Sequence, residues 1–163
     1  MTGAIATRLA RPADLPALAA LFGEMERHYR PDLTVADATL AARADAALFG
    51  KRPVAEALLA ETSGRLVGFA FFSAYFPTVG GGTGALLKDL YVTAAARRRG
   101  VARALLRALA REAIARGWER IEFATGTDNQ VARAAYAAMG APLHDHVAYR
   151  FEGDELRRLA VQS

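Results

Sequence analysis

The chain has 163 residues, a length typical of one domain, and we expect a single domain over residues 1–163. Hydrophobic residues make up 53% and charged residues 23%, a balance that excludes a disordered chain. There is no cysteine, which excludes a disulfide framework, a thiolate metal site and a cysteine nucleophile. The longest apolar run, residues 66–76, is about half the length of a membrane span, so we expect no membrane partner.

The net charge is +4, and only Lys51 and Lys88 among the basic residues are lysine. Arginine in place of lysine, together with abundant alanine, is typical of a GC-rich genome. The basic balance therefore favours a solvated basic surface over a nucleic-acid partner. No charged segment followed by an apolar stretch and a cleavage site is visible at the N-terminus, so we expect a bacterial cytoplasmic protein.

The first part of the chain predicts one strand and two helices. A short strand is expected over residues 4–9, and Asp14 is placed to cap the helix that follows. The helical apolar pattern fades near Tyr29. A second helix is expected from a cap at Thr34 to Gly50.

The hydrophobic period then changes to that of strands. Residues 54–61 and 66–75 flank a Ser63-Gly64 turn and predict an antiparallel hairpin. A glycine-rich loop over 77–84 leads into a strand over 85–92. No helix follows this loop directly, which favours a flexible hairpin tip over a substrate pocket above a phosphate cradle.

The second half alternates helices and strands. We expect a helix over 100–116, a strand over 119–125, a helix over 128–139, and a late strand over 144–151 followed by a short polar tail. Gly117 and Gly140 stand just past the two helices, where a left-handed C-cap is common. The order of elements predicts an α+β fold, an α/β sandwich in which helices cover both faces of a mixed, mostly antiparallel sheet.

A basic turn between the strand 85–92 and the next helix is the most informative segment. Three arginines, residues 97–99, precede Gly100 and Ala102, which are small enough to let a ligand approach the backbone. The first N–H groups of a helix have no intrahelical partner and suit a pyrophosphate. The turn matches neither a Walker loop nor a dinucleotide fingerprint. The alternatives are an ordinary basic turn or a nucleic-acid contact, and no interleaved aromatic residues support the latter.

Two motifs carry a resemblance to a known family. Arg97-x-x-Gly100-x-Ala102 resembles the acetyl-CoA signature of the GNAT superfamily of N-acetyltransferases. Asn129 and Tyr136, within the segment that ends at Gly140, resemble the second GNAT motif. The predicted order of elements also matches the GNAT fold. The resemblance implies acetyl-CoA as cosubstrate, direct transfer to a primary amine of a small molecule, and a homodimer formed through the late strand and tail.

The resemblance also assigns roles in the donor site. The backbone of the strand should pair with the pantetheine arm, and the turn with the helix start should wrap the pyrophosphate. The expected donor-binding residues of this region are Leu90, Tyr91, Val92, Arg97, Arg98, Arg99, Gly100, Val101, Ala102 and Arg103. Asn129 should hold the arm, Ala132 is expected to bind the donor as well, and Tyr136 should stand near the sulfur.

Acetyl transfer to an amine calls for an acid and a base. Tyr136 suits the acid because its pKa near 10 keeps it protonated, so it can donate to the departing thiolate; the alternative is a core aromatic residue. Asp89 is a candidate base, although strand alternation places it on the face opposite Lys88, which holds the usual family base position. His144 and His146 share a strand face, but no third ligand is apparent, so we expect no metal.

The chain is most similar to the spermidine/spermine acetyltransferase-like branch, whose fourth strand resembles residues 86–92. Its polyamine enzymes carry acidic side chains where this chain has Lys88 and, by a looser alignment, Arg30 and His146. We therefore expect Tyr29, Arg30, Lys88 and His146 to line an acceptor site that disfavours polyamines. Glu24, Glu26 and Asp89 remain as a possible acidic wall. The alternative function is a non-catalytic acetyl-CoA-binding sensor, favoured by the loss of the acidic residue at position 88.

Overall fold

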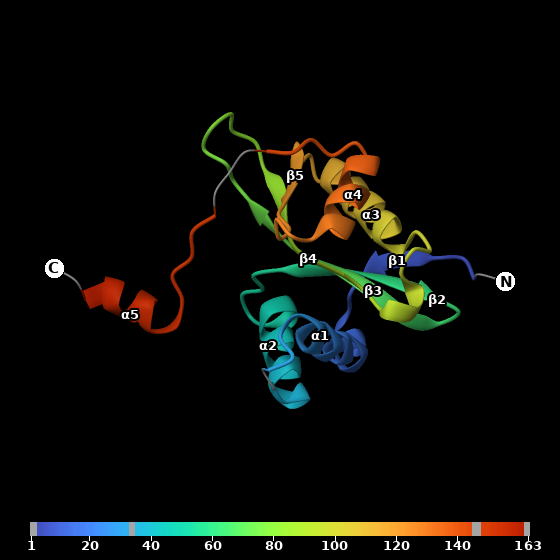
Figure 1. The fold of residues 1–163 in the computed structure, drawn as a ribbon, viewed down its shortest axis with the longest axis horizontal. Coiled ribbons are helices and arrows are strands. Elements are labelled where there is room, and N and C mark those ends of the chain that lie inside the picture. Colours follow the sequence, from blue (N-terminus) through green and yellow to red (C-terminus); the bar gives the residue numbers. More distant parts are fainter. Residues whose placement is uncertain (1–2, 33–34, 145–147, 162–163) are drawn as a thin grey trace. The chain divides into compact units, whose positions relative to one another are not determined.

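The computed structural model describes residues 3–32, 35–144 and 148–161 (Figure 1). The chain divides into two compact units, Met1–Ala124 and Thr125–Ser163. Among the described residues, the first unit contains the sheet, three α-helices and two short 3-10 helices, and the second contains two α-helices.

A five-stranded sheet with the order β1-β2-β3-β4-β5 forms the centre of the first unit. Its strands are β1 (Ala6–Leu9), β2 (Glu56–Thr62), β3 (Arg65–Tyr75), β4 (Gly84–Val92) and β5 (Arg120–Phe123). Neighbouring strands are antiparallel except for β4 and β5, which are parallel. The predicted hairpin and the mixed, mostly antiparallel sheet are confirmed.

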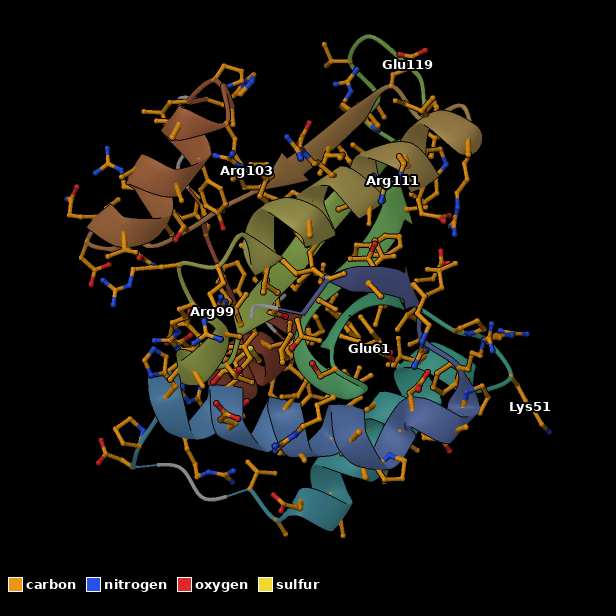
Figure 2. The ribbon with its side chains drawn as sticks, turned by 90° about the vertical axis from the view of Figure 1, so that its right-hand side faces the viewer. Lys51, Glu61, Arg99, Arg103, Arg111 and Glu119 are labelled. Atoms are coloured by element: carbon orange, nitrogen blue, oxygen red, sulfur yellow. The ribbon has the colours of Figure 1, made fainter. Side chains whose placement is uncertain are left out.

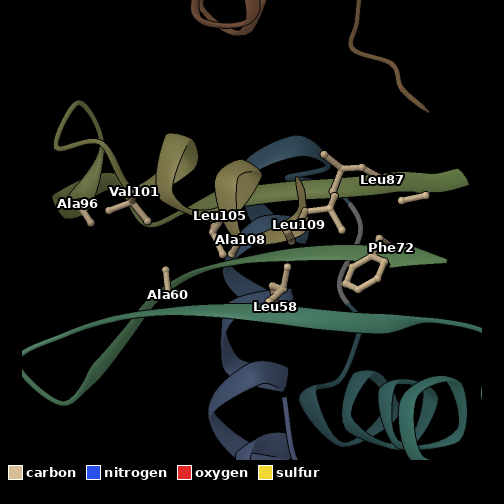
Figure 3. Close-up of a cluster of buried hydrophobic side chains, with 11 residues drawn as sticks. Leu58, Ala60, Phe72, Leu87, Ala96, Val101, Leu105, Ala108 and Leu109 are labelled. Atoms are coloured by element: carbon tan, nitrogen blue, oxygen red, sulfur yellow. The ribbon is translucent and has the colours of Figure 1, made fainter. Parts of the chain in front are cut away.

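Helices cover both faces of this sheet, as predicted. Helices α1 (Leu15–Tyr29) and α2 (Asp37–Phe49) lie on one face, and α3 (Val101–Ala115) lies on the other (Figure 1). On the α3 side the buried cluster includes Leu58, Ala60, Ala70, Phe72, Leu87, Val101, Leu105 and Leu109 (Figure 3). On the α1 and α2 side it includes Leu18, Leu21, Leu48, Ala57, Leu59, Phe69 and Tyr91. Alternate residues of β2 thus enter opposite layers, which explains its unbroken apolar sequence.

The start of α1 differs from the expected cap. Asp14 holds the N-cap position, but its carboxylate does not cap the helix. It accepts hydrogen bonds from Arg8 Nη1 at 2.6 Å and from the backbone N–H of Arg11 at 2.8 Å. A charge-assisted bond to a guanidinium is stronger than a bond to a neutral N–H group, so the arginine of β1 takes the carboxylate.

The start of α2 follows Ala36, and the predicted cap Thr34 lies outside the described residues. The helix ends at Phe49, directly before Gly50, as predicted. Helix α3 follows Gly100 and ends just before Arg116 and Gly117, again as predicted; Gly117 has φ +70°.

The second unit contains α4 (Gln130–Ala138) and α5 (Gly153–Val161). The first confirms the predicted helix. The expected late strand is wrong for its described residues, His144 and 148–151, and the expected polar tail contains α5 instead. A strand requires a neighbour for its backbone groups, which an alternating sequence does not provide. Helix α5 has local support from Asp154, which accepts a bond from Arg157 at 2.6 Å.

Candidate active site

One edge of β4 is open over its second half. Strand β5 pairs with β4 only from Gly84, opposite Arg120, to Leu87, opposite Phe123. Beyond Leu87, no described strand of this unit pairs with that edge of residues 88–92, while the other edge stays paired with β3. The predicted arm-binding residues 90–92 lie on this stretch. An extended molecule with amide groups can pair with such an edge as a further strand would.

The turn after β4 delivers the chain to the start of α3. Arg98 has φ +60° and Gly100 has φ +85°, so two positions of this turn adopt the left-handed conformation. A Cβ atom at Gly100 would meet no atom within 4 Å, so the backbone conformation and not crowding calls for glycine. The first helical bond joins Ala104 N–H to Gly100 O at 2.9 Å. The N–H groups of residues 101–103 precede it and can face an anion.

The arginines of this turn divide into two kinds. Arg97 folds back on the strand: its Nε donates to Val92 O at 3.1 Å, and its guanidinium carbon lies 6.0 Å from the centre of the Tyr91 ring. Arg98, Arg99 and Arg103 are exposed, and no described carboxylate forms an ion pair with them; Figure 2 shows Arg99 on the turn and Arg103 on α3. These three side chains are available to phosphate groups.

A β-bulge in β4 changes which face each side chain occupies. Phe72 pairs with Leu87 and Phe71 pairs with Asp89, so Lys88 is the extra residue. Leu87 packs on the α3 side before the bulge, whereas Leu90 packs on the same side after it. The alternation changes phase at Lys88, so the prediction that Lys88 and Asp89 occupy opposite faces is wrong.

Asp89 is half-buried, and Lys88 is exposed. Burial raises the pKa of the Asp89 carboxyl above its ordinary value; the neighbouring Lys88 opposes this rise, and Glu26 of α1 adds to it. A carboxyl with a raised pKa is a stronger base than an exposed aspartate, which suits removal of a proton from an ammonium group.

The side chain of Tyr91 joins β4 to α1, a contact that the sequence did not indicate. Its hydroxyl donates to Glu24 Oε1 at 2.8 Å, and burial together with Glu24 raises the pKa of Tyr91 to about 12. Tyr91 therefore has two separate roles in the fold: its backbone pairs with Phe69 of β3, and its side chain holds α1 in place. In the sequence, Glu24 is a polar residue between apolar positions of the predicted helix, and nothing else there indicates its bond to Tyr91.

The expected acceptor residues are not all brought together. Tyr29 and Arg30 lie at the end of α1, where Tyr29 is 61% exposed and its ring lies 5.0 Å from that of His28. Lys88 lies on β4, and the described contacts join it to neither Tyr29 nor Arg30. His146 lies outside the described residues. The glycine-rich loop lies before β4, where Arg120 Nη2 donates to Gly81 O at 3.4 Å, at the opposite end of that strand from the arginine turn.

The second unit carries the other predicted motif. The side-chain oxygen of Asn129 accepts a hydrogen bond from the Ala132 N–H at 3.1 Å and caps α4. This bond engages the Ala132 N–H and leaves the side-chain NH₂ of Asn129 as a further donor. Helix α4 has no buried residue, so Tyr136, which is partly exposed, is not a core aromatic residue.

The described parts of the chain contain neither a metal-binding cluster nor a membrane-spanning helix. No group of three or more His, Asp or Glu side chains there could hold a metal ion. None of the helices there is long and apolar enough to span a membrane.

The open edge of β4 can pair with an extended molecule, and the N-terminus of α3 that follows it can bind an anion. A family model described as acetyltransferase (GNAT) family matches residues 22–141. The chain therefore belongs to the GNAT acetyltransferase family and is an acetyl-CoA-dependent N-acetyltransferase, which confirms the predicted superfamily and enzyme class.

Solved structures with the same fold support this assignment. An integron cassette protein from the mobile metagenome of V. cholerae is 27% identical, with a TM-score of 0.88 over 97% of this chain and 98% of that chain. A ribosomal-protein-alanine N-acetyltransferase from Brucella melitensis biovar Abortus 2308 is 25% identical, with a TM-score of 0.74 over 92% of this chain and 100% of that chain.

An aminoglycoside N-acetyltransferase, AAC(6')-Iy in complex with CoA, is 19% identical, with a TM-score of 0.75 over 93% of this chain and 96% of that chain. At that identity the likeness shows the fold alone. No curated protein matches the chain. The predicted GNAT fold is confirmed.

Proposed function

We propose that this acetyltransferase transfers the acetyl group of acetyl-CoA directly to a primary amine of a small molecule, within a ternary complex. The observation that supports this most is the open edge of residues 88–92, which leads through left-handed Gly100 to the N-terminus of α3. The edge suits the amides of a pantetheine arm, and the helix start suits a pyrophosphate. A chain without cysteine has no thiol for an acyl-enzyme, which favours direct transfer.

The donor contacts follow from these elements. Backbone groups of Leu90 and Val92, which face the open edge, bind the arm, whereas those of Tyr91 pair with Phe69 of β3. The N–H groups of residues 101–103, with Arg98, Arg99 and Arg103, bind the phosphates by charge-assisted hydrogen bonds. Arg97 keeps the end of β4 in shape through its bond to Val92 O. Asn129 and Ala132 are assigned to the donor by the family resemblance alone.

The reaction requires a neutral amine. An amine with a pKa near 10 is neutral in only about one molecule in a thousand at pH 7. Asp89 accepts the ammonium proton, directly or through water, and the amine nitrogen then attacks the thioester carbonyl carbon. The C–S bond breaks with its electron pair on sulfur, and Tyr136 donates a proton to that thiolate. The acetylated nitrogen releases its second proton, which restores the Tyr136 hydroxyl through solvent.

The acceptor is proposed to be a small amine other than a polyamine. Lys88 is exposed on the bulge beside Asp89, so a second ammonium group near it would meet repulsion. Solved structures with this fold include aminoglycoside acetyltransferases and a ribosomal-protein-alanine N-acetyltransferase. The names of these proteins describe acetyl transfer to amine-bearing acceptors, which supports an amine acceptor here. The spermidine/spermine-like branch and a bacterial cytoplasm stay predictions from the sequence.

The test is an acceptor screen with acetyl-CoA that follows the free thiol, with mass spectrometry of each product. Thiol release that depends on one amine, with a mass gain of one acetyl group, supports the proposal. Binding of CoA without thioester consumption across a broad panel would favour the sensor function, for which Lys88 at the usual base position is the supporting observation.

A homodimer is a further part of the proposal. The second unit exposes apolar side chains, among them Tyr149 at 91% and Phe151 at 59% exposure. Such side chains lose contact with water when a second copy covers them. Light scattering at micromolar concentration is expected to give twice the mass of the chain, and a monomer mass there removes the dimer from the proposal.

A further inference from the structure

Helix α1 presents a carboxylate to the proposed base. The Phe22 ring of α1 lies 5.7 Å from the Phe71 ring, edge to face, and Phe71 pairs directly with Asp89 across β3 and β4. Glu26 stands one helical turn after Phe22, on the same side of α1. The helix therefore carries Glu26 over the position of Asp89.

The hydrogen bond between Tyr91 and Glu24 fixes this arrangement. Tyr91 is two residues after Asp89 on β4, so the two side chains share one face of the strand beyond the bulge. The bond from Tyr91 to Glu24 at 2.8 Å ties that face to α1 two residues before Glu26. Two independent contacts, one aromatic and one polar, thus set the distance between the helix and the base.

We propose that Glu26 is a positioning residue for acetyl transfer, whose carboxylate, held beside Asp89 by α1, makes Asp89 a stronger base toward the acceptor ammonium. This inference rests on the proposed function. A negative charge close to a carboxylate stabilises the protonated form of that carboxylate. The charge of Glu26 affects the basicity of Asp89 more at this half-buried position than it would at an exposed one, because solvent screens the interaction less.

Other charged groups around Asp89 limit how much Glu26 increases its basicity. Lys88, adjacent in the chain, lowers the pKa of Asp89, whereas burial and Glu26 raise it. Glu24 accepts a hydrogen bond from the Tyr91 hydroxyl, and the guanidinium carbon of Arg97 lies 6.0 Å from the centre of the Tyr91 ring. Glu26 is therefore the carboxylate of α1 that acts on Asp89.

The experiment compares pH profiles of kcat/KM for the wild type, Glu26→Gln and Glu24→Gln, with the best amine from the acceptor screen. The acidic limb is expected to move down by about half a unit or more in Glu26→Gln. It is expected to stay in place in Glu24→Gln, which removes a carboxylate of the same helix and lowers thermal stability. Glu26→Lys, which reverses the charge, is expected to move the limb further in the same direction.

An acidic limb at the wild-type position in both Glu26 variants would overturn the inference. An equal shift in Glu24→Gln would also overturn it, because the effect would then belong to the helix as a whole. If no amine releases thiol, the proposed function fails, and a ¹³C NMR titration of the Asp89 carboxyl in the wild type and Glu26→Gln still decides the inference. A titration midpoint that is the same in both proteins rejects it.

Discussion

Leu87 and Phe123 form the last pair of the parallel ladder between β4 and β5, and the bulge at Lys88 follows directly. Two changes therefore coincide in β4. Its pairing with β5 ends, and the alternation of its side chains between the two faces of the sheet changes phase. The first change leaves the backbone groups of Leu90 and Val92 facing an open edge, and the second turns Asp89 toward α1. A one-residue register slip in β4 would disturb both halves of the proposed site.

Replacement of Gly100 by valine tests the donor site. Valine strains the left-handed backbone at φ +85° and adds a branched side chain at the start of α3, so CoA binding is expected to weaken at least tenfold, about 1.4 kcal/mol. Calorimetry measures the affinity. Gly117→Val is the matched control, because Gly117 also has a positive φ at +70° and open space around a Cβ, but at the other end of α3. Equal CoA affinity in Gly100→Val and the wild type would remove the assignment.

Removal of the Tyr136 hydroxyl tests the acid. Tyr136→Phe keeps the ring and loses the proton donor, so kcat is expected to fall about 10²-fold or more with little change in Tm. Tyr149→Phe, an exposed tyrosine of the same unit, is expected to retain full kcat. Full activity with a lowered Tm in Tyr136→Phe would make this tyrosine a structural residue.

The charge at position 88 tests the acceptor class. A cation about 4 Å from Lys88 meets roughly 1 kcal/mol of repulsion in water and about 4 kcal/mol at a partly buried site, so spermidine is expected to be a poorer acceptor than lysine-like amino acids. Comparison of kcat/KM for both amines measures this, and Lys88→Glu is expected to reverse the preference. Lys51→Glu is the control, since Lys51 is the other lysine and projects into solvent (Figure 2). A wild-type preference for spermidine of tenfold or more contradicts the argument.

The ion pair of Arg8 and Asp14 predicts how stability depends on pH. The hydrogen bond from Arg8 holds the pKa of the Asp14 carboxyl below its ordinary value, so the pair stabilises the fold above the unfolded-state pKa near 4. That contribution is lost as the pH falls through the lower, folded-state pKa. Because the Arg8 side chain is 36% exposed and therefore screened, Asp14→Asn is expected to cost only about 1 kcal/mol at pH 7.

Chemical unfolding at pH 7 and at pH 3 measures this cost, which is expected to be smaller at the lower pH. Asp37→Asn serves as the control, because the ion pair of Asp37 with Arg27, at 3.7 Å, is exposed. A cost for Asp14→Asn that is the same at both pH values contradicts the assignment of the stabilisation to the ionised pair.

Features set by a few neighbouring residues were predictable from the sequence. The Ser63-Gly64 turn, the helix start after Gly100 and the helix end at Gly117 each depend on a local backbone conformation, and the structure confirms all three. The motif at residues 97–102 indicated the family because its residues are close together in the sequence, and the family model confirms that family.

Features that depend on distant partners were not predictable. The bulge at Lys88 results from how β4 pairs with β3, and no residue of β4 signals it. Asp14 has the sequence of a helix cap, yet Arg8 of β1 takes its carboxylate. The alternating pattern of 148–151 resembles a strand, but the described residues there form none, since pairing and not pattern makes a strand.

The unbroken apolar run in β2 also bears on how this enzyme can evolve. Ala57 and Leu59 support the layer of α1, and Leu58 and Ala60 support the layer of α3, with all four at most 2% exposed. A change of volume at any of them is transmitted to the layer that carries Glu26 or to the layer that begins at Gly100. Substitutions at exposed positions such as Lys88 and Arg30 can therefore change the acceptor preference without disturbing the core. Substitutions in β2 would disturb the packing of both layers, because its side chains enter both.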